Sequence, residues 1–388
     1  MHNNGKKRRT IKDTIDASKN IKPKEEKYYH NIKFVYSSFI SSSTKNTKKK
    51  NQNERIEKIE NSIRGFENLG NTCYMNSFLQ IIIHIPSLID SLIKKGKELD
   101  KNSLIKSLID VAQRPTKENL KEIKQKIGSI DSNYMLNSQE DSQEFGVKLI
   151  NSLIDEEFNN QLFKVWSDPN YSYNSRNKKL FEAKLSTLNE FKDNPDYDFQ
   201  KETFLQEIFQ FYESEYKLNK HQKITNINYN PEIDNQLSLE LNYKDKNEIL
   251  TLKELLKNKY CKTTRKLFKL PKIFIITILR AFLGSNRLNN TEIIFEDELD
   301  LNEFMDEDFG EYKDPTLYYL FSINMSSGES KNSGHYSSYI KINNIWHYFN
   351  DKRVSRKDPD FKKKDEKGIF YQSKEVYGLF YIRKNEIQ

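Results

Sequence analysis

Apolar residues recur at helical spacing through the first part of this chain, up to about residue 160. The clearest set follows Asn71-Thr72, residue types that favour a helix start, and ends before Pro86, which a helix interior excludes. Its apolar positions follow the i, i+3, i+4, i+7 pattern: Met75, Phe78, Leu79 and Ile82. We therefore expect a capped, half-buried helix there. The same reasoning predicts helices over residues 88–99, 104–112, 120–127, 142–158 and 202–216.

The pattern changes to that of β-strands after Gln236. Residues 237–241 alternate apolar and polar, and residues 272–282 and 318–325 are long apolar runs rich in β-branched or aromatic side chains. Between the helical and the β parts, residues 164–235 contain several X-Pro loop signals. Helices first and strands afterwards predict an α+β protein with two lobes and a cleft between them.

The first 60 residues show no sustained periodicity and carry an unbalanced charge. The chain has 64 Lys and Arg against 56 Asp and Glu, a net charge of +8. Residues 1–60 hold 16 basic and 7 acidic residues, which leaves 48 against 49 for the rest. We expect a basic, mostly disordered tail, with an apolar segment at 28–40 that docks on the domain or on a partner. Its Lys clusters fit a solvated arm, and alternatively a nuclear-import signal or a nucleic-acid contact.

Composition narrows the class of protein further. Two cysteines, Cys73 and Cys261, are too few for a disulfide framework or a structural zinc site. No run approaches the ~18–20 apolar residues that span a bilayer, and the N-terminus lacks an apolar signal region. We expect a protein of the cytoplasm or nucleus, or both, stabilised by burial of its aromatic and aliphatic side chains.

Cys73 is the first candidate for chemistry, because it falls in the first turn of the helix predicted after Thr72. Unpaired N–H groups at a helix N-terminus stabilise a thiolate, whereas an isolated cysteine is more often a buried structural thiol. The surrounding sequence favours the first interpretation. Residues 65–77 contain two glycines and three asparagines, which suits a loop that offers N–H donors to a developing oxyanion.

A thiolate nucleophile needs a base, and His335 lies in a predicted hairpin. Asn343-Asn344 suits a two-residue turn, because asparagine tolerates positive φ. That turn pairs residues whose numbers sum to 687, which places Asn350 on the face of His335 and Asp351 on the opposite face. We therefore expect Asn350 to orient His335 and Asp351 to support it, whereas a bulge or a longer loop would reverse the two roles.

Taken together, these segments resemble the ubiquitin-specific proteases, a family of papain-like thiol deubiquitinases. Residues 65–80 resemble the Cys box of the family and residues 318–350 its His box. Residues 139–145 resemble its acidic-glutamine box, residues 270–282 one of its core strands and residues 377–381 its last core strand. The resemblance covers residues 63–385 in the family's order, which identifies that stretch as the catalytic domain and 164–235 as a variable fingers region or insertion.

The resemblance implies an α+β, papain-like fold with a helical thumb, a β-rich palm and fingers. It implies hydrolysis after the C-terminal glycine of ubiquitin through a thioester, with ubiquitin and ubiquitinated proteins as partners. Whether an activating partner protein is also needed is left open by the sequence. By position, Cys73 is the nucleophile, His335 its base, Asn350 the third triad member and Asn68 an oxyanion-hole donor.

The resemblance also assigns a substrate-binding segment. Asp141, Gln143 and Glu144 would meet the basic ubiquitin tail, although the same residues equally fit an ordinary acidic helix start. The two Cys-x-x-Cys pairs that hold zinc in many members are missing, so we expect fingers without metal and no cofactor. The alternative function is a catalytically weak scaffold that binds ubiquitin.

Overall fold

The computed structural model of this chain describes residues 63–95, 99–100, 102–159, 203–218, 224–228, 234–241, 248–280, 288–306, 315–330, 333–366 and 368–384. These residues lie within one compact unit, Glu54–Ile387. The tail predicted over residues 1–60 and the first part of the segment 164–235, up to residue 202, fall outside the described residues, so the predictions for both remain predictions.

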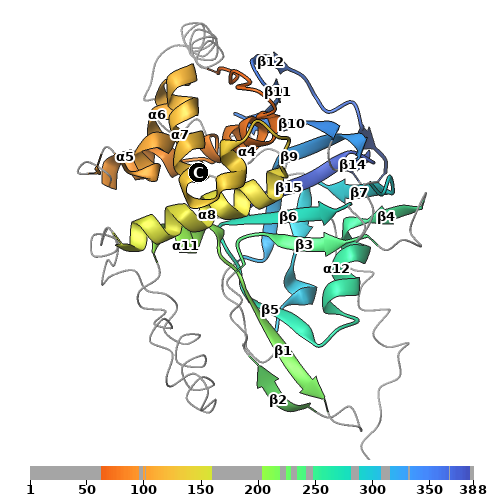
Figure 1. Ribbon diagram of the computed structural model, residues 1–388. Coiled ribbons are helices and arrows are strands. Elements are labelled where there is room, and N and C mark those ends of the chain that lie inside the picture. Colours follow the sequence, from red (N-terminus) through yellow and green to blue (C-terminus); the bar gives the residue numbers. More distant parts are fainter. Residues whose placement is uncertain are drawn as a thin grey trace, which may run out of the picture. The chain divides into compact units, whose positions relative to one another are not determined.

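A large mixed sheet carries most of the β structure (Figure 1). Its strands follow the order β12-β11-β10-β9-β15-β6-β3, and β8 pairs with β9 beside that row. Only the pairing of β3 with β6 is parallel in the part of this sheet that is described. The bounds are β3 Leu237–Glu240, β6 Ile273–Leu279, β8 Glu298–Asp300, β9 Leu317–Ser330, β10 Ser333–Ile342, β11 Ile345–Asn350, β12 Arg353–Arg356 and β15 Val376–Arg383.

Both faces of this sheet are buried, which explains why strand β6 is almost continuously apolar. In β6, Ile273 and Ile275 belong to one hydrophobic core, while Phe274, Ile276 and Ile278 belong to another. Successive side chains of a strand point to opposite faces, so a strand covered on both sides has no polar positions to alternate with. The strand expected within 272–282 is confirmed as β6, which lies inside the large sheet between β15 and β3.

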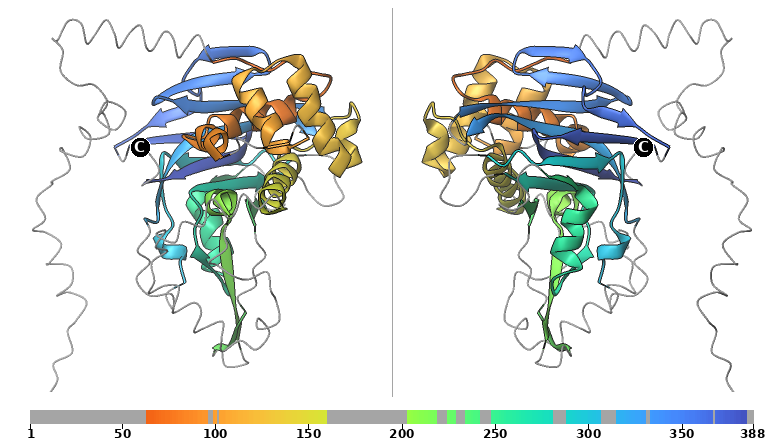
Figure 2. Two further views of the ribbon diagram at one scale, coloured as in Figure 1. Left: turned by 90° about the vertical axis from the view of Figure 1, so that its left-hand side faces the viewer. Right: turned by 90° about the vertical axis from the view of Figure 1, so that its right-hand side faces the viewer.

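Helices cover one face of the sheet and form the first core with it. Figure 2 shows them grouped on one side of the blue strands. They are α4 Cys73–Ile83, α5 Leu88–Lys95, α6 Leu104–Gln113, α7 Lys117–Ile130, α8 Ser142–Asn159 and α11 Phe204–Phe209, with the 3-10 turn η3 Ser132–Met135 between α7 and α8. Helix α4 contacts β9, β10, β11 and α8. It is almost fully buried, so the expectation of a half-buried helix is wrong in that respect.

The second core lies on the other face, between the sheet and smaller elements. A four-stranded sheet in the order β13-β14-β7-β4 and helix α12 pack there. A three-stranded sheet in the order β2-β1-β5 extends away from the large sheet in Figure 1. The bounds are β13 Lys362–Lys364, β14 Ile369–Ser373, β7 Glu292–Glu296, β4 Ile249–Thr251, α12 Leu252–Tyr260, η6 Asn302–Phe304, β2 Ile224–Asn228, β1 Tyr212–Leu218 and β5 Arg265–Lys269.

One predicted helix is only partly present. The helix expected over 202–216 ends at Phe209 as α11, and strand β1 begins at Tyr212. A capping box of Thr203 and Gln206 starts the helix as a helical pattern would. The continuation pairs with β5, where Glu213 and Glu215 both lie near Arg265. Cross-strand pairing therefore overrides the local helical pattern.

Helix α8 joins the other helices at both its ends. Its Glu156 accepts the Leu104 N–H at 2.5 Å at the start of α6, and its buried Glu157 accepts the Leu205 N–H at 2.9 Å at the start of α11. Carboxylates at helix N-termini satisfy N–H groups that have no partner within the helix. At the other end, the start of α8 lies beside the start of α4, where the site is built.

In the described residues no single helix is long and apolar enough to cross a membrane; α4 with Leu88–Lys94 passes by length and composition, but the two are bent by 75°.

Candidate active site

Cys73 is the first residue of α4 and is only 3% exposed. The preceding loop turns sharply at Gly70 and Asn71, which have φ of 105° and 53°. The N-cap is Thr72 as predicted, but its hydroxyl makes no cap bond, because it accepts the Leu69 N–H at 2.9 Å instead. Because the Thr72 side chain does not bond to them, the N–H groups in the first turn of α4, including that of Cys73, are available to a ligand.

The hairpin that carries the candidate base has the predicted register. Ile342 pairs with Ile345, and Asn343 and Asn344 have φ of 52° and 61°, as a two-residue turn requires. His335 Nε2 and Asn350 Oδ1 lie 2.7 Å apart. An amide oxygen can only accept, so Nε2 carries the proton and Nδ1 faces the other partner. The prediction that Asn350 contacts His335 is confirmed.

That other partner is Cys73, whose side chain forms a hydrogen bond with His335. The hydrogen bond with Cys73 raises the pKa of His335 to about 9, with a further contribution from Asn350 and despite partial burial, which lowers it. The charges of Cys73 and Asp351 act in the same direction. An imidazolium beside a sulfur is the arrangement that favours a thiolate–imidazolium pair at neutral pH. Cys73, His335 and Asn350 therefore lie in one line of contacts.

Asp351 departs from the strand geometry that was used to place it. It has a φ of 49°, so the chain leaves the strand at this residue and the prediction that it faces away does not apply. Its Oδ2 accepts from Asn68 Nδ2 at 2.9 Å and its Oδ1 accepts from Asn76 Nδ2 at 2.7 Å. Asp351 thus ties the end of β11 to the loop that precedes Cys73 and to α4.

The same contacts fix the side chain of Asn68. Its Oδ1 accepts the N–H groups of Gly70 at 2.9 Å and Thr72 at 3.2 Å, while one hydrogen of Nδ2 goes to Asp351. The amide group is held at both its atoms, and its second Nδ2 hydrogen has no partner among these contacts. Asn68 is exposed, so this donor can meet an incoming carbonyl.

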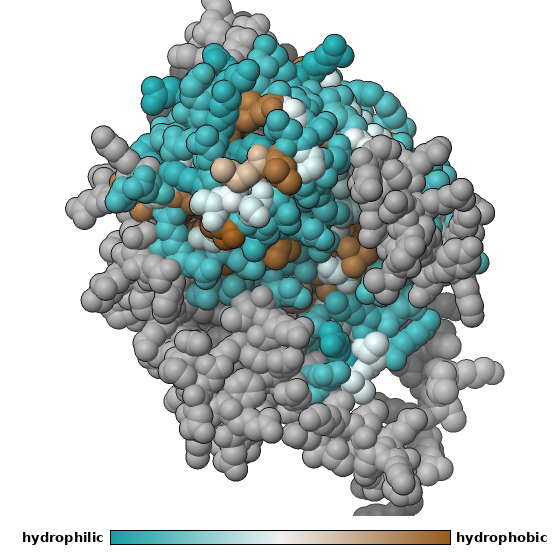
Figure 3. Space-filling model, viewed as in Figure 1, coloured by the Kyte–Doolittle hydropathy of each residue, from teal (hydrophilic) through white to brown (hydrophobic). Residues whose placement is uncertain are grey.

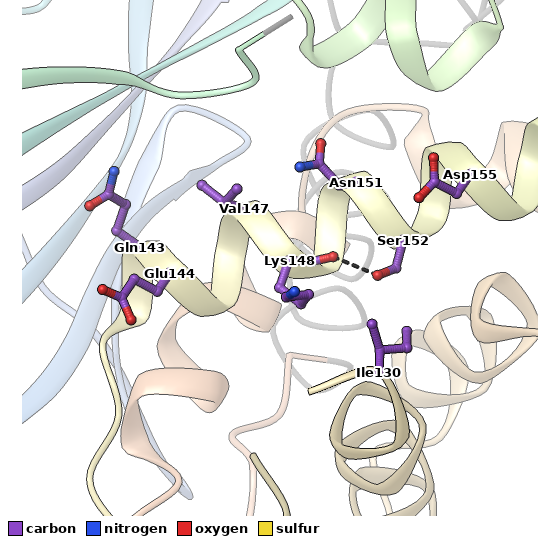
Figure 4. Close-up of a pocket in the computed structure, with 8 residues that line it drawn as sticks. All are labelled: Ile130, Gln143, Glu144, Val147, Lys148, Asn151, Ser152 and Asp155. Atoms are coloured by element: carbon purple, nitrogen blue, oxygen red, sulfur yellow. Dashed lines mark hydrogen bonds between the residues drawn. The ribbon is translucent and has the colours of Figure 1, made fainter. Parts of the chain in front are cut away.

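The predicted substrate-binding residues divide into two kinds. Asp141 precedes α8 and caps it, since its Oδ1 accepts the N–H groups of Gln143 at 2.7 Å and Glu144 at 3.2 Å. Its Oδ2 accepts from the hydroxyl of Tyr377. The interpretation of Asp141 as part of an ordinary helix start is therefore supported. Gln143 and Glu144 instead line an open cavity of about 490 Å³ on the outer face of α8 (Figure 4).

Gln139 is a contact of Cys73 that the sequence reasoning missed. Its Nε2 lies 3.9 Å from Cys73 Sγ, within the range for a hydrogen bond to sulfur. The only signal was its place in the acidic-glutamine segment, two residues before Asp141. Spacing alone could not show that this segment reaches the start of α4.

In the part of the chain that is described, no three His, Cys, Asp or Glu side chains are grouped so as to hold a metal ion. Cys261 is exposed at the end of α12. Fingers without metal therefore remain a prediction from the sequence.

Comparison with known proteins agrees with this geometry. A family model described as ubiquitin carboxyl-terminal hydrolase matches residues 64–381. The ubiquitin carboxyl-terminal hydrolase 37 of Homo sapiens is 32% identical over 117 residues, which are 28% of this chain and 12% of that protein. The ubiquitin carboxyl-terminal hydrolase 12 of Saccharomyces cerevisiae is 34% identical over 109 residues, 23% of this chain and 9% of that protein. The matches thus span a small part of each relative.

Solved structures match over most of the chain. The SAGA Ubp8/Sgf11/Sus1/Sgf73 DUB module bound to ubiquitin aldehyde has a TM-score of 0.58 and 21% identity, and the match covers 83% of this chain and 70% of the matched chain. The same module bound to monoubiquitin has a TM-score of 0.58 and 20% identity over 96% of this chain and 75% of the matched chain. At this identity the likeness shows the fold, and the expected α+β, papain-like architecture is confirmed. This chain belongs to the ubiquitin carboxyl-terminal hydrolase family of cysteine-type enzymes, as a member of the ubiquitin-specific protease type.

Proposed function

We propose that this chain is an active thiol isopeptidase that hydrolyses the bond after the C-terminal glycine of ubiquitin. The observation that carries the proposal is the position of His335 between Cys73 and Asn350, with a pKa of about 9. A base that is held by a third residue next to a nucleophile is the arrangement that acyl transfer needs. The family membership supplies the substrate class.

In this mechanism the thiolate of Cys73 attacks the glycine carbonyl. The free Nδ2 hydrogen of Asn68 and the N–H of Cys73 receive the oxyanion, at the helix N-terminus where negative charge is favoured. The imidazolium of His335 gives its Nδ1 proton to the leaving lysine amine, and a thioester to Cys73 remains. Water then attacks the thioester and gives a proton to His335, the Cys73 sulfur leaves as the thiolate, ubiquitin is released and the thiolate–imidazolium pair is restored.

Substrate binding is proposed for the outer face of α8. Gln143 and Glu144 lie at the end of the Figure 4 cavity nearest the start of this helix, and Asp155 lies at its other end. Carboxylates and amides at such a cavity can form charge-assisted hydrogen bonds with basic residues of a ubiquitin tail. Because Asp141 is already bonded to the helix start and to Tyr377, we assign it the role of holding α8 in place.

Exposed apolar side chains at the end of α7 and in the residues that follow it support the binding of a protein. Ile130, which lines the cavity, is 52% exposed, and Met135 and Leu136 are 54% and 60% exposed. Figure 3 shows brown apolar patches among hydrophilic side chains over the helical part of this face. Exposed apolar groups that gather in one place, rimmed by polar residues, are typical of protein-binding surfaces.

The second candidate is a scaffold that binds ubiquitin without turnover. The line of contacts through Cys73, His335 and Asn350 favours the enzyme, because binding alone requires none of them. The two functions separate in a paired assay on an isopeptide-linked diubiquitin. Wild type should cleave it and Cys73→Ala should bind it without cleavage. If wild type binds the diubiquitin under reducing conditions but does not cleave it, the result would support the scaffold function and contradict the enzyme.

A further proposal is that a partner protein activates this chain. Ubp8, the related enzyme of known structure, is found in a module with Sgf11, Sus1 and Sgf73. If this chain also needs a partner, the purified chain should cleave diubiquitin slowly and the same chain purified with its bound proteins should cleave it faster. Equal rates for the two preparations would contradict this proposal.

A further inference from the structure

Gln139 contacts the reacting atom of the site and has no role in the mechanism above. It lies between η3 and α8 and is half-buried, and its Nε2 is 3.9 Å from Cys73 Sγ. His335 approaches the same sulfur from β10. The sulfur therefore has a cationic neighbour on one element and a neutral amide donor on another.

The segment that precedes Gln139 is held by three hydrogen bonds, one from the loop before α4 and two from α7. Asn71 Nδ2 donates to the Asn137 carbonyl at 2.8 Å. The buried ammonium of Lys124, on α7, donates to the carbonyls of Leu136 at 2.9 Å and Met135 at 3.2 Å. On the C-terminal side, Asp141 is fixed by its bonds with the Gln143 N–H and the Tyr377 hydroxyl. Bonds on both sides of Gln139 therefore restrict where its amide can go, which is the condition for a preorganised donor.

We propose that Gln139 is a further catalytic residue, whose side-chain amide donates a hydrogen bond to the sulfur of Cys73 and stabilises its thiolate form. A primary amide does not lose its protons near neutral pH, so it can donate to the sulfur whether or not His335 is protonated. Hydrogen bonds to charged groups are stronger than those to neutral ones, so this contact favours the thiolate over the thiol. The inference rests on the proposed function for the role of Cys73 as nucleophile.

The test is the rate of alkylation of Cys73 by iodoacetamide as a function of pH, in the full chain without ubiquitin. The modified peptides are quantified separately, so the exposed Cys261 provides an internal control in every sample. Wild type is compared with Gln139→Ala, which removes the donor, and with Gln139→Glu, which replaces the donor by an anion of similar shape. Gln139→Met, of similar length, takes the place of the alanine variant if that variant does not fold.

In Gln139→Ala we expect Cys73 to react about threefold to tenfold more slowly on the acid side of the profile, with the midpoint moved to higher pH. The glutamate variant should show a larger effect of the same sign, and Cys261 should react at the same rate in all samples. A Cys73 profile that coincides with wild type in both variants overturns the proposal. So does a lower kcat/KM for ubiquitin conjugates with an unchanged alkylation profile, because that result assigns Gln139 to substrate binding. Because alkylation needs no ubiquitin, failure here is distinguishable from failure of the proposed activity.

Discussion

At the scale of single residues, the site depends on two neighbours at the end of β11 that act on different partners. Asn350 contacts His335, whereas Asp351 contacts Asn68 and Asn76. The contact of Asn350 with His335 could be predicted, because a two-residue turn fixes the register of the hairpin up to Asn350. The contacts of Asp351 could not be predicted in this way, because its positive φ ends the alternation of the strand.

This division of roles predicts two different kinetic defects. Asn350→Ala should slow both the alkylation of Cys73 and the hydrolysis of ubiquitin conjugates, the latter by about 10- to 100-fold, because His335 loses its orientation. Asp351→Ala should slow hydrolysis by about 100-fold with a smaller effect on alkylation, since alkylation develops no oxyanion for Asn68 to stabilise. Equal effects of Asp351→Ala on both reactions would contradict the role given to Asn68.

The pKa of His335 predicts the basic limb of the pH profile. A raised pKa means that the imidazolium persists up to about pH 9, so kcat/KM should fall as pH rises through about 9. The stability that this group contributes has the same sign, being fully present below pH 6.5 and lost as pH rises through about 9. In Asn350→Ala one of the raising contacts is missing, so the basic limb should move to lower pH. A limb that stays in place would show that another group controls it.

At the scale of elements, the active site is formed where α4 and α8 begin, and its geometry depends on how closely these two helices pack. Gly146 of α8 faces the ring of Phe78 of α4, and a Cβ on Gly146 would lie 2.2 Å from that ring. Ser142 Oγ donates to the Tyr74 carbonyl at 3.1 Å nearby. The helical pattern predicted both helices, but the sequence could not show that a glycine inside one of them marks the crossing point.

Gly146→Ala is therefore expected to lower the free energy of unfolding by about 1–3 kcal/mol, although alanine is the better helix former. Gly128→Ala in α7 is the matched control. A Cβ there would meet the side chain of Met135 at 2.4 Å, and that side chain is flexible and half-exposed. Urea unfolding of the two variants should show the larger loss at Gly146, and an equal loss in both would contradict the account of this crossing.

At the scale of the whole molecule, the order of helices and strands, the burial of β6 on both faces and the contact of His335 with Asn350 follow from patterns in the sequence. Three features did not follow. Strand β1 lies where the sequence has a helical pattern. Strands β4, β8 and β13 have only three residues each, too few to show a period. The contact of Gln139 with Cys73 depends on how α7, α8 and α4 pack together. Each of these depends on tertiary pairing, which local periodicity does not contain.

The shortage of cysteines leads to a prediction for the molecule as a whole. With Cys73 assigned to chemistry, Cys261 is the one thiol left in the sequence, too few for the fingers-tip zinc site of the family. A strong chelator should therefore leave both kcat/KM and the unfolding midpoint unchanged. Loss of activity with the chelator, restored by added zinc, would contradict this.

We propose above that Cys73 is the nucleophile of a working ubiquitin hydrolase. The most direct measurement is the mass of the full chain after incubation with ubiquitin that carries a C-terminal electrophile, under reducing conditions, followed by identification of the modified peptide. We expect one ubiquitin per chain, attached to Cys73, and no adduct with Cys73→Ala. No adduct with wild type, or an adduct on Cys261 that persists in Cys73→Ala, would contradict the claim.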